Sequence, residues 1–309
     1  MKFNIPAIIG FNDNLRVSSS VITLGNFDGI HLGHKSLIDN LITESKKIED
    51  SPSLLITFNP HTQDILSQNN DLELITLHEA KIELLNNYEI DYISIVDFDD
   101  NFSKLSAEEF IELIIEKYNP KSIIIGYDSK FGYKGRGDYL FLKEYLSQKN
   151  INVYQNKPYS LNGKIIKSSL IKNLIIKGDI ESVNKYLGRR FTISGRIIKG
   201  DKIGHSLGFP TANLSLRDTQ QIIPKVGVYS VTLFFDNVEY KALCNIGHRP
   251  TFFENGKLSI ESYIINYDES NLYDKKVDIK FNFYIREEKA FANKEDLIKQ
   301  INKDIQVIE

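Results

Sequence analysis

The sequence predicts two domains, an α/β domain with a parallel sheet followed by an all-β antiparallel barrel or sandwich. The length of 309 residues is more than one compact core usually reaches. Up to about Tyr154, short apolar runs alternate with segments of helical period, whereas after Lys177 β-rich runs follow one another at regular spacing. A composition with 41% hydrophobic and 26% charged residues is typical of globular proteins.

The first half contains five apolar runs separated by amphipathic segments, a pattern typical of parallel strands covered by helices. The runs are VITLG (21–25), SLLITF (53–58), DYISIV (91–96), KSIIIG (121–126) and INVYQ (151–155). Two apparent capping boxes, Thr76 with Glu79 and Ser106 with Glu109, predict helices near 77–87 and 107–118.

The second half is rich in β-branched and aromatic residues, with turns at Gly, Asn and Asp. The predicted strands lie in FTISGRIIKG (191–200), GVYSVTLFFD (227–236), VEYKALCNIG (238–247), LSIESYIINY (258–267) and KVDIKFNFYI (276–285). An Asn cap at Asn293 and an apolar stripe predict a last helix to about Ile305, packed on this β domain. The boundary is expected within 180–190, which gives domains of 1–184 and 185–309.

Composition excludes several classes of protein. A net charge of -3, from 38 basic and 41 acidic residues, argues against a nucleic-acid binder or a membrane-surface binder. Cys244 is the only cysteine, so neither an intrachain disulfide nor a thiolate metal cluster can form, and it is interpreted as a small buried hydrophobe. MKFNIPAIIG is too short and too broken by Pro6 for a signal segment, so a soluble cytoplasmic protein is expected. The oligomeric state is left open.

The segment GNFDGIHLGHKSLI follows the first predicted strand and leads into an amphipathic helix. A strand-to-helix turn of this kind lies at the ligand-binding edge of an open α/β sheet. Glycines allow close backbone approach, and the helix N-terminus and two imidazoles three residues apart favour an anion. The predicted phosphate-site residues are Gly25, Asn26, Phe27, Asp28, Gly29, His31 and His34. Surface histidines or a metal-binding pair are the alternatives.

These residues resemble a known family. GNFDGIHLGH is similar to the HxGH signature of the nucleotidyltransferase superfamily, in the longer form used by bacterial FAD synthetases. The resemblance implies a Rossmann-like nucleotidyltransferase domain. It also implies that His31 and His34 stabilise charge on the α-phosphate while a second substrate attacks and pyrophosphate leaves.

Three further segments resemble parts of the same family. TFNPHT (57–62) is similar to the turn that contacts flavin phosphate and metal, GYDSKFGYKGRGD (126–138) to the flavin and nucleotide loop, and KSSLIKNLI (167–175) to the segment that closes on ATP phosphates. The residues that the resemblance assigns to binding are Asn59, Pro60, His61, Gly126, Asp128, Phe131, Arg136, Ser168, Ser169 and Lys172. Ser129 stands where the family usually has an aromatic residue, and Lys172 where it has arginine. By residue type alone, 126–138 favours a glycine-rich surface loop.

A second site is predicted in GDKIGHSLGFPTANL (200–214). In an extended run Thr211 and Asn213 project to one face, and their oxygens suit Mg²⁺ carrying nucleotide phosphates. An ordinary polar loop is the alternative by residue type. LGFPTANL, however, closely resembles the signature of riboflavin kinases. That resemblance implies a Greek-key-type barrel and nucleotide contacts at Gly204, Gly208 and Pro210.

Glu261 alternates with buried positions in LSIESYIINY, and by residue type it could be a solvated edge carboxylate. The resemblance implies that it is the catalytic base that accepts the proton of the riboflavin 5′-hydroxyl. Arg286, in IREEKAF, is predicted to line the flavin and nucleotide pockets or to be ordinary surface charge.

Together the motifs predict a bifunctional enzyme that makes FMN from riboflavin and ATP in the second domain, then FAD from FMN and ATP in the first. The expected ligands are riboflavin, FMN, FAD, ATP and ADP, with Mg²⁺ required for both steps. One alternative, motivated by Ser129 and Lys172, is a riboflavin kinase with weak or lost adenylylation. The other is a regulatory protein that senses flavin and nucleotide.

Overall fold

The computed structural model describes residues 6–13, 17–66, 72–198, 209, 211–216, 220–248, 258–267 and 272–308. Its contacts divide the chain into two compact units, Met1–Ser168 and Ser169–Glu309. Apart from Ser168, helices α6 (Ser168–Lys177) and α7 (Ile180–Leu187) fall within the second unit. The domain boundary between residues 184 and 185 stays a prediction.

The first unit is built on a six-stranded sheet with the order β1-β4-β3-β2-β5-β6, in which every strand pair is parallel. The strands are β1 (Ala7–Gly10), β2 (Ser20–Leu24), β3 (Ser53–Asn59), β4 (Tyr92–Asp97), β5 (Pro120–Ile125) and β6 (Asn152–Gln155). The five predicted strands are confirmed. The four-residue strand β1, which forms one edge of the sheet, was not predicted.

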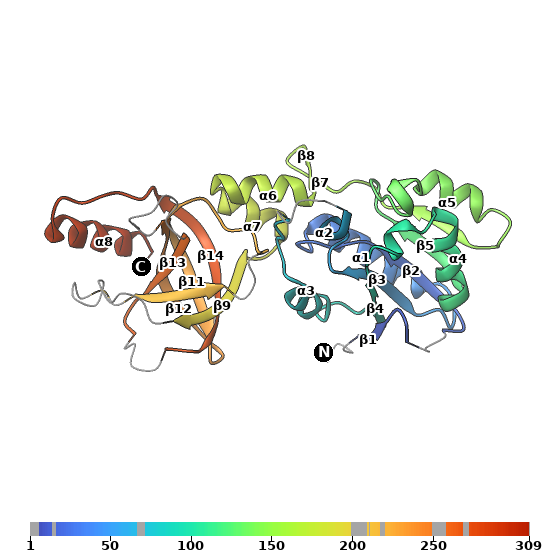
Figure 1. Cartoon of the computed structure of the whole chain (residues 1–309), viewed down its shortest axis with the longest axis horizontal. Helices are drawn as coiled ribbons and strands as arrows, with labels where there is room; N and C mark the ends of the chain where they lie inside the picture. The colour runs from blue at the N-terminus through green and yellow to red at the C-terminus, as the bar shows by residue number, and fades with distance from the viewer. Residues whose placement is uncertain are drawn as a thin grey trace. The chain divides into compact units, whose positions relative to one another are not determined.

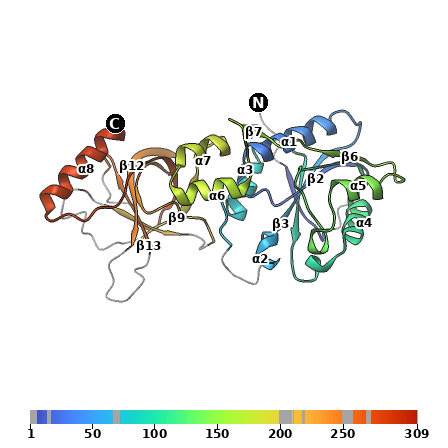
Figure 2. The same ribbon diagram turned by 90° about the horizontal axis from the view of Figure 1, so that it is seen from above.

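Helices cover both faces of this sheet (Figures 1 and 2). They are α1 (Leu32–Ser45), α2 (Thr62–Leu66), α3 (His78–Leu85), α4 (Ala107–Tyr118) and α5 (Tyr139–Tyr145), with short 3₁₀ turns η1 (Phe102–Lys104) and η2 (Tyr133–Gly135) and a hairpin of β7 (Ser160–Leu161) and β8 (Lys164–Ile165). Because side chains alternate along a strand, Val21 of β2 packs with α1 and α3, and Ile22 packs with α4 and α5. The predicted layered α/β arrangement is confirmed.

One of the two predicted capping boxes is correct. Ser106 Oγ accepts the Glu109 N–H at 3.1 Å, and Glu109 Oε2 accepts the Ser106 N–H at 2.7 Å, at the start of α4. The box at Thr76 is wrong, because α3 begins one residue later with Leu77 as its N-cap and no side-chain cap. The Thr76 N–H instead donates to Asp28 Oδ1 at 3.1 Å, so a tertiary contact takes the backbone group that the box needed.

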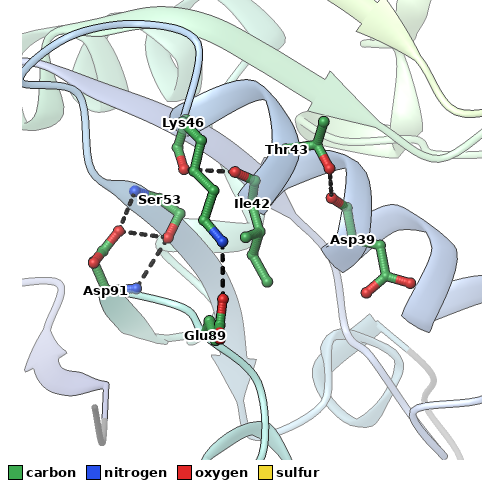
Figure 3. A network of polar contacts seen from close by, with 8 residues as sticks. Asp39, Ile42, Thr43, Lys46, Ser53, Glu89 and Asp91 are labelled. Carbon is green, nitrogen blue, oxygen red and sulfur yellow. Dashed lines mark hydrogen bonds and ion pairs between the residues drawn. The ribbon is translucent and has the colours of Figure 1, made fainter. Parts of the chain in front are cut away.

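The amino ends of β3 and β4 carry a separate polar network (Figure 3). Asp91 Oδ2 accepts the N–H and the hydroxyl of Ser53 at 2.8 and 2.7 Å, and Lys46 pairs with Glu89 at 2.8 Å. Lys46, Glu89 and Asp91 border a groove of about 990 Å³. The groove lies at the opposite edge of the sheet from the motif loops, so it is not part of the predicted site.

The second unit is a closed antiparallel barrel with the strand order β10-β13-β12-β11-β14-β9 (Figure 1). Its strands are β9 (Thr192–Ile198), β10 (Ala212–Leu216), β11 (Gly227–Phe235), β12 (Val238–His248), β13 (Leu258–Ile264) and β14 (Lys276–Arg286). Strands β11 to β14 lie in the spatial order 4-1-2-3, which is a Greek key. The structure therefore confirms the barrel and excludes the sandwich.

The last helix, α8, spans Lys294–Ile308 and ends three residues beyond the predicted Ile305. The Asn293 cap is confirmed, because its Oδ1 accepts the Asp296 N–H at 2.9 Å. The predicted apolar stripe, which includes Leu297 and Ile301, is half-buried.

Candidate functional site

The predicted motifs of the first unit follow three neighbouring strands at the same edge of the sheet. Gly25 comes directly after β2, Asn59 ends β3, and Gly126 follows β5. The chain runs from β2 through β3 to β4 on one side and continues with β5 and β6 on the other. The carboxyl ends of β2 and β5 therefore form the switch point of the sheet, which is where ligands bind in open α/β folds.

The loop after β2 has a strained backbone, and contacts with other segments of the chain hold it in place. Phe27, Gly29 and Ile30 all have positive φ, at 53°, 85° and 37°. Glycine suits the φ of Gly29, which L side chains rarely adopt, and a Cβ there would lie 3.1 Å from the Ile75 side chain. The Asp28 carboxylate is buried and accepts the Ile75 N–H at 2.9 Å, which ties the loop to the segment before α3.

Two other motif residues complete this support. The Asn26 side chain makes a reciprocal pair with Thr62, donating to its hydroxyl at 2.8 Å and accepting its N–H at 3.2 Å. Ser168, at the start of α6, donates its hydroxyl to the Asp28 carbonyl at 2.9 Å. Asn26 and Asp28 of the histidine motif are thus brought together with Ser168, which was predicted from a separate motif.

The two motif histidines are stacked at the start of α1. Their ring centroids are 3.7 Å apart with an interplanar angle of 12°, and the Phe27 ring makes a T-shaped contact with His34 at a centroid distance of 5.2 Å. His31 is the N-cap, and its Nδ1 accepts the His34 N–H at 3.2 Å. Because Nδ1 is an acceptor, neutral His31 carries its proton on Nε2, where it is a donor for an anion. The arrangement combines imidazole donors with the positive end of a helix.

The turn after β3 contains a cis peptide bond between Asn59 and Pro60. Asn59 is exposed, and His61 is half-buried with its Nδ1 accepting the Gln63 N–H at 3.2 Å. By the same reasoning as for His31, neutral His61 offers an Nε2 donor.

The loop 126–138 divides into exposed and structural residues. Asp128 and Arg136 are exposed, and Gly126 is half-buried at the end of β5. Phe131 is only 7% exposed and packs on Phe110 and Phe141 with centroid distances of 5.8 and 6.0 Å. Phe131 is therefore part of the aromatic core, and its assignment to binding stays a prediction.

Ser169 and Lys172 lie in α6, within the second unit. Their contribution to the phosphate site stays a prediction.

The barrel brings Thr211, Asn213 and Glu261 to one outer face. Asn213 of β10 is the register partner of Glu261 of β13, and the Thr211 hydroxyl lies 3.5 Å from Glu261 Oε2. The alternation predicted for β13 is confirmed, since Ile260 and Ile264 are buried in the barrel while Glu261 is half-buried outside. Two neutral oxygens beside one carboxylate are a donor set that Mg²⁺ prefers. The predicted Gly204, Gly208 and Pro210 lie outside the described residues.

Arg286 of β14 forms an ion pair with the last helix. Its Nε and Nη2 donate to both oxygens of Asp304 in α8, at 2.7 to 3.1 Å, and its Nη1 donates to the Glu287 carbonyl at 2.9 Å. Asp304 is 3% exposed. The guanidinium therefore holds α8 on the barrel, and its assignment to the flavin and nucleotide pockets stays a prediction.

Comparison with protein families decides the identity of both units. The model of FAD synthetase matches residues 14–170, and the model of riboflavin kinase matches residues 187–309. The chain belongs to the family of bifunctional riboflavin kinase/FMN adenylyltransferases.

Relatives with that name cover nearly the whole chain. The protein of Buchnera aphidicola from Schizaphis graminum is 40% identical, over 94% of this chain and 93% of its own length. The protein of Bacillus subtilis is 33% identical over 94% and 91%, and that of Escherichia coli K12 is 30% identical over 92% and 90%. Full-length relatives with both activities in their name favour the bifunctional reading over the kinase-only and sensor alternatives.

A crystal structure from Streptococcus pneumoniae, described as a macrolide-efflux protein, has a closely similar fold. Its TM-score is 0.89 at 27% identity, and the match covers 97% of this chain and 98% of that one. Within the ranges that the structure describes, no helix of this chain has the length and apolar character needed to cross a membrane. These ranges also hold no group of three or more His, Cys, Asp or Glu that could bind a metal ion, so the histidine pair does not form such a cluster.

Sequence reasoning missed two residues beside the family motifs. Asn245 of β12 is the register partner of Glu261, and its Nδ2 donates to Glu288 Oε1 at 3.1 Å. The alternation in ALCNIG could have placed Asn245 outside the barrel. Lys81 of α3 is 5% exposed beneath the loop after β2. A lysine four residues before buried Leu85 was its signal, because positions i and i+4 share one helix face.

Proposed function

We propose that the barrel transfers the γ-phosphate of ATP to riboflavin and that the first unit transfers the adenylyl group of a second ATP to the resulting FMN. The observation that carries this proposal is the pairing of Glu261 with Thr211 and Asn213 on one barrel face, in a chain whose other unit carries stacked histidines at a helix start.

In the kinase reaction, Glu261 accepts the proton of the riboflavin 5′-hydroxyl as that oxygen attacks the γ-phosphorus, and the bond to ADP breaks. The half-buried position of Glu261 keeps its carboxylate within reach of a substrate on the outer face. Thr211 and Asn213 would hold Mg²⁺ through their side-chain oxygens, and that ion would neutralise charge on the nucleotide phosphates.

In the adenylylation reaction, the FMN phosphate attacks the α-phosphorus of ATP and pyrophosphate leaves. His31 and His34 donate hydrogen bonds to the α-phosphate oxygens, where negative charge increases in the transition state. Asn59 and His61 lie at the adjacent strand end and are proposed to contact the flavin phosphate. Gly126, Asp128 and Arg136, in the loop after β5, are proposed to line the other side of the site.

The test is to incubate the purified full chain with riboflavin, ATP and Mg²⁺ and to resolve the flavins by chromatography. Both FMN and FAD are expected. Accumulation of FMN without FAD would restrict the chain to the kinase, and the absence of both products would refute the proposal.

Two variants assign the sites. Glu261→Gln is expected to abolish FMN formation while leaving adenylylation of supplied FMN, and His31→Ala is expected to do the reverse. Glu239→Gln, an exposed carboxylate of the same barrel, is the matched control and should retain both reactions. Loss of both activities in a folded Glu261→Gln or His31→Ala protein would show that the sites are not independent.

A further inference from the structure

A buried lysine lies beneath the proposed adenylylation site without belonging to any of the motifs. Lys81, in α3, is 5% exposed, and its Nζ has three acceptors: the Asn26 carbonyl at 3.2 Å, the Thr57 hydroxyl at 2.9 Å and the Phe58 carbonyl at 3.2 Å. An ammonium group has three protons, so all of its donors are used. Its acceptors come from the loop after β2 and from the end of β3.

Lys81 carries a buried charge whose hydrogen-bond partners are not themselves charged. Its bonded partners are neutral oxygens, and Asp28 is the acid that acts on it electrostatically. Burial lowers the pKa of Lys81 to about 8, and burial with the nearby Lys81 charge lowers the pKa of His78 to about 4. At neutral pH, Lys81 is therefore mostly charged and His78 is neutral. Burying an ammonium is costly, and an apolar side chain would fill the same space without that cost.

The contacts of Lys81 determine how the motif loop is oriented. The peptide bond between Asn26 and Phe27 is trans, since the cis bond of the described chain is at Asn59. In a trans peptide, the carbonyl and the following N–H point in opposite directions. The ammonium draws the Asn26 carbonyl inward, so the Phe27 N–H points away from the buried cluster. The same ammonium joins this loop to Phe58, the residue before the predicted flavin-phosphate turn.

We propose that Lys81 is a positioning residue for adenylylation, which fixes the loop carrying the histidine motif against the strand end that precedes the flavin turn. The inference rests on the proposed adenylyltransferase function. Lys81 makes no contact with the reacting groups in this role. It sets the relative positions of the two segments that approach the ATP and the FMN phosphate.

The test uses the full chain and measures kcat and KM for both reactions in each variant. Lys81→Met is expected to lower kcat for adenylylation by about 100-fold, as misplacement of a reacting group by about 1 Å does, while KM for ATP and FMN changes much less. Kinase turnover in the same protein should be unchanged. Lys46→Met, which removes an exposed lysine of the same unit, is the control and should leave both reactions at the wild-type rate.

A second pair of variants tests the same contact without removing the charge. Thr57→Val removes one acceptor of the ammonium at nearly constant volume, together with the longer bond that the Thr57 hydroxyl donates to the Asn26 carbonyl at 3.4 Å, whereas Thr57→Ser keeps the hydroxyl. Thr57→Val is expected to lower kcat for adenylylation several-fold, and Thr57→Ser should restore it. This pair decides the question if Lys81→Met does not fold.

The outcomes separate this inference from the function on which it rests. If the wild-type chain makes no FAD, the proposed function fails. If the wild type makes FAD and folded Lys81→Met makes it at a similar kcat, or if Thr57→Val and Thr57→Ser are equal, the positioning role of Lys81 is refuted.

Discussion

Removal of the Asp304 carboxylate should detach α8 from the barrel. In Asp304→Ala, the Arg286 guanidinium, whose side chain is 15% exposed, loses its three contacts with the carboxylate. Gln300 also loses the oxygen to which its Nε2 donates at 2.8 Å. Breaking a buried pair by removing one partner costs about 3–5 kcal/mol because a charge is left uncompensated. The partial exposure of Arg286 favours the lower end, about 3 kcal/mol.

The assay is thermal unfolding of the full chain, followed by kinase activity. A loss of about 3 kcal/mol corresponds to a fall in Tm of about 10 °C for a domain of this size. Glu287→Ala is the matched control, since it breaks the adjacent exposed pair with Lys225 and should leave Tm unchanged. A Tm for Asp304→Ala equal to that of the control would refute the reasoning.

A double variant separates the two roles considered for Arg286. Arg286→Met with Asp304→Leu replaces the ion pair by apolar side chains and is expected to recover most of the lost Tm, since such replacements are often neutral or stabilising. If Arg286 only holds α8, kinase activity should recover as well. Recovered Tm without kinase activity would return Arg286 to the nucleotide pocket.

Four further predictions concern the capping box, the cysteine and, in two cases, pH. Ser106→Ala should lower the free energy of unfolding by about 1 kcal/mol, because the Glu109 N–H loses its cap, as measured by urea denaturation. Burial raises the pKa of Cys244 to about 12, so native protein at pH 8 should not react with a thiol reagent, whereas unfolded protein should; rapid labelling of native protein would contradict this. The folded pKa of His78, about 4, lies below its unfolded value of 6.5, so the unfolded state binds more protons between these two pH values. The free energy of unfolding should therefore decrease as pH falls from 6.5 to 4, and His78→Asn should reduce that decrease in urea titrations. The folded pKa of Lys81, about 8, is also depressed from 10.5, so wild-type stability should rise from pH 8 to 10.5 relative to Lys81→Met.

The sequence by itself determined most of the longer elements and the motif turns, because these depend on local patterns. Strands such as β2 and β5 are continuous apolar runs, and the cap at Ser106 lies within one turn of its helix. The motif GNFDGIHLGH placed His31 and His34 at a helix start, and both lie there. Alternation in β13 placed Glu261 outside the barrel.

Only the tertiary structure decided which polar groups meet, because their partners are distant in the chain. Thr76 lost its predicted capping role to Asp28, 48 residues away, and Arg286 bonds Asp304 on another element. Phe131 lies in the aromatic core because its loop packs against Phe110 of α4. The periodicity of the sequence does not predict this contact. The hydrogen bonds of Lys81 could not be predicted from the sequence of α3 either, since its three acceptors lie on two other segments. The periodicity of a helix or strand determines on which face a side chain lies. The partner that it meets on that face depends on strand order and register.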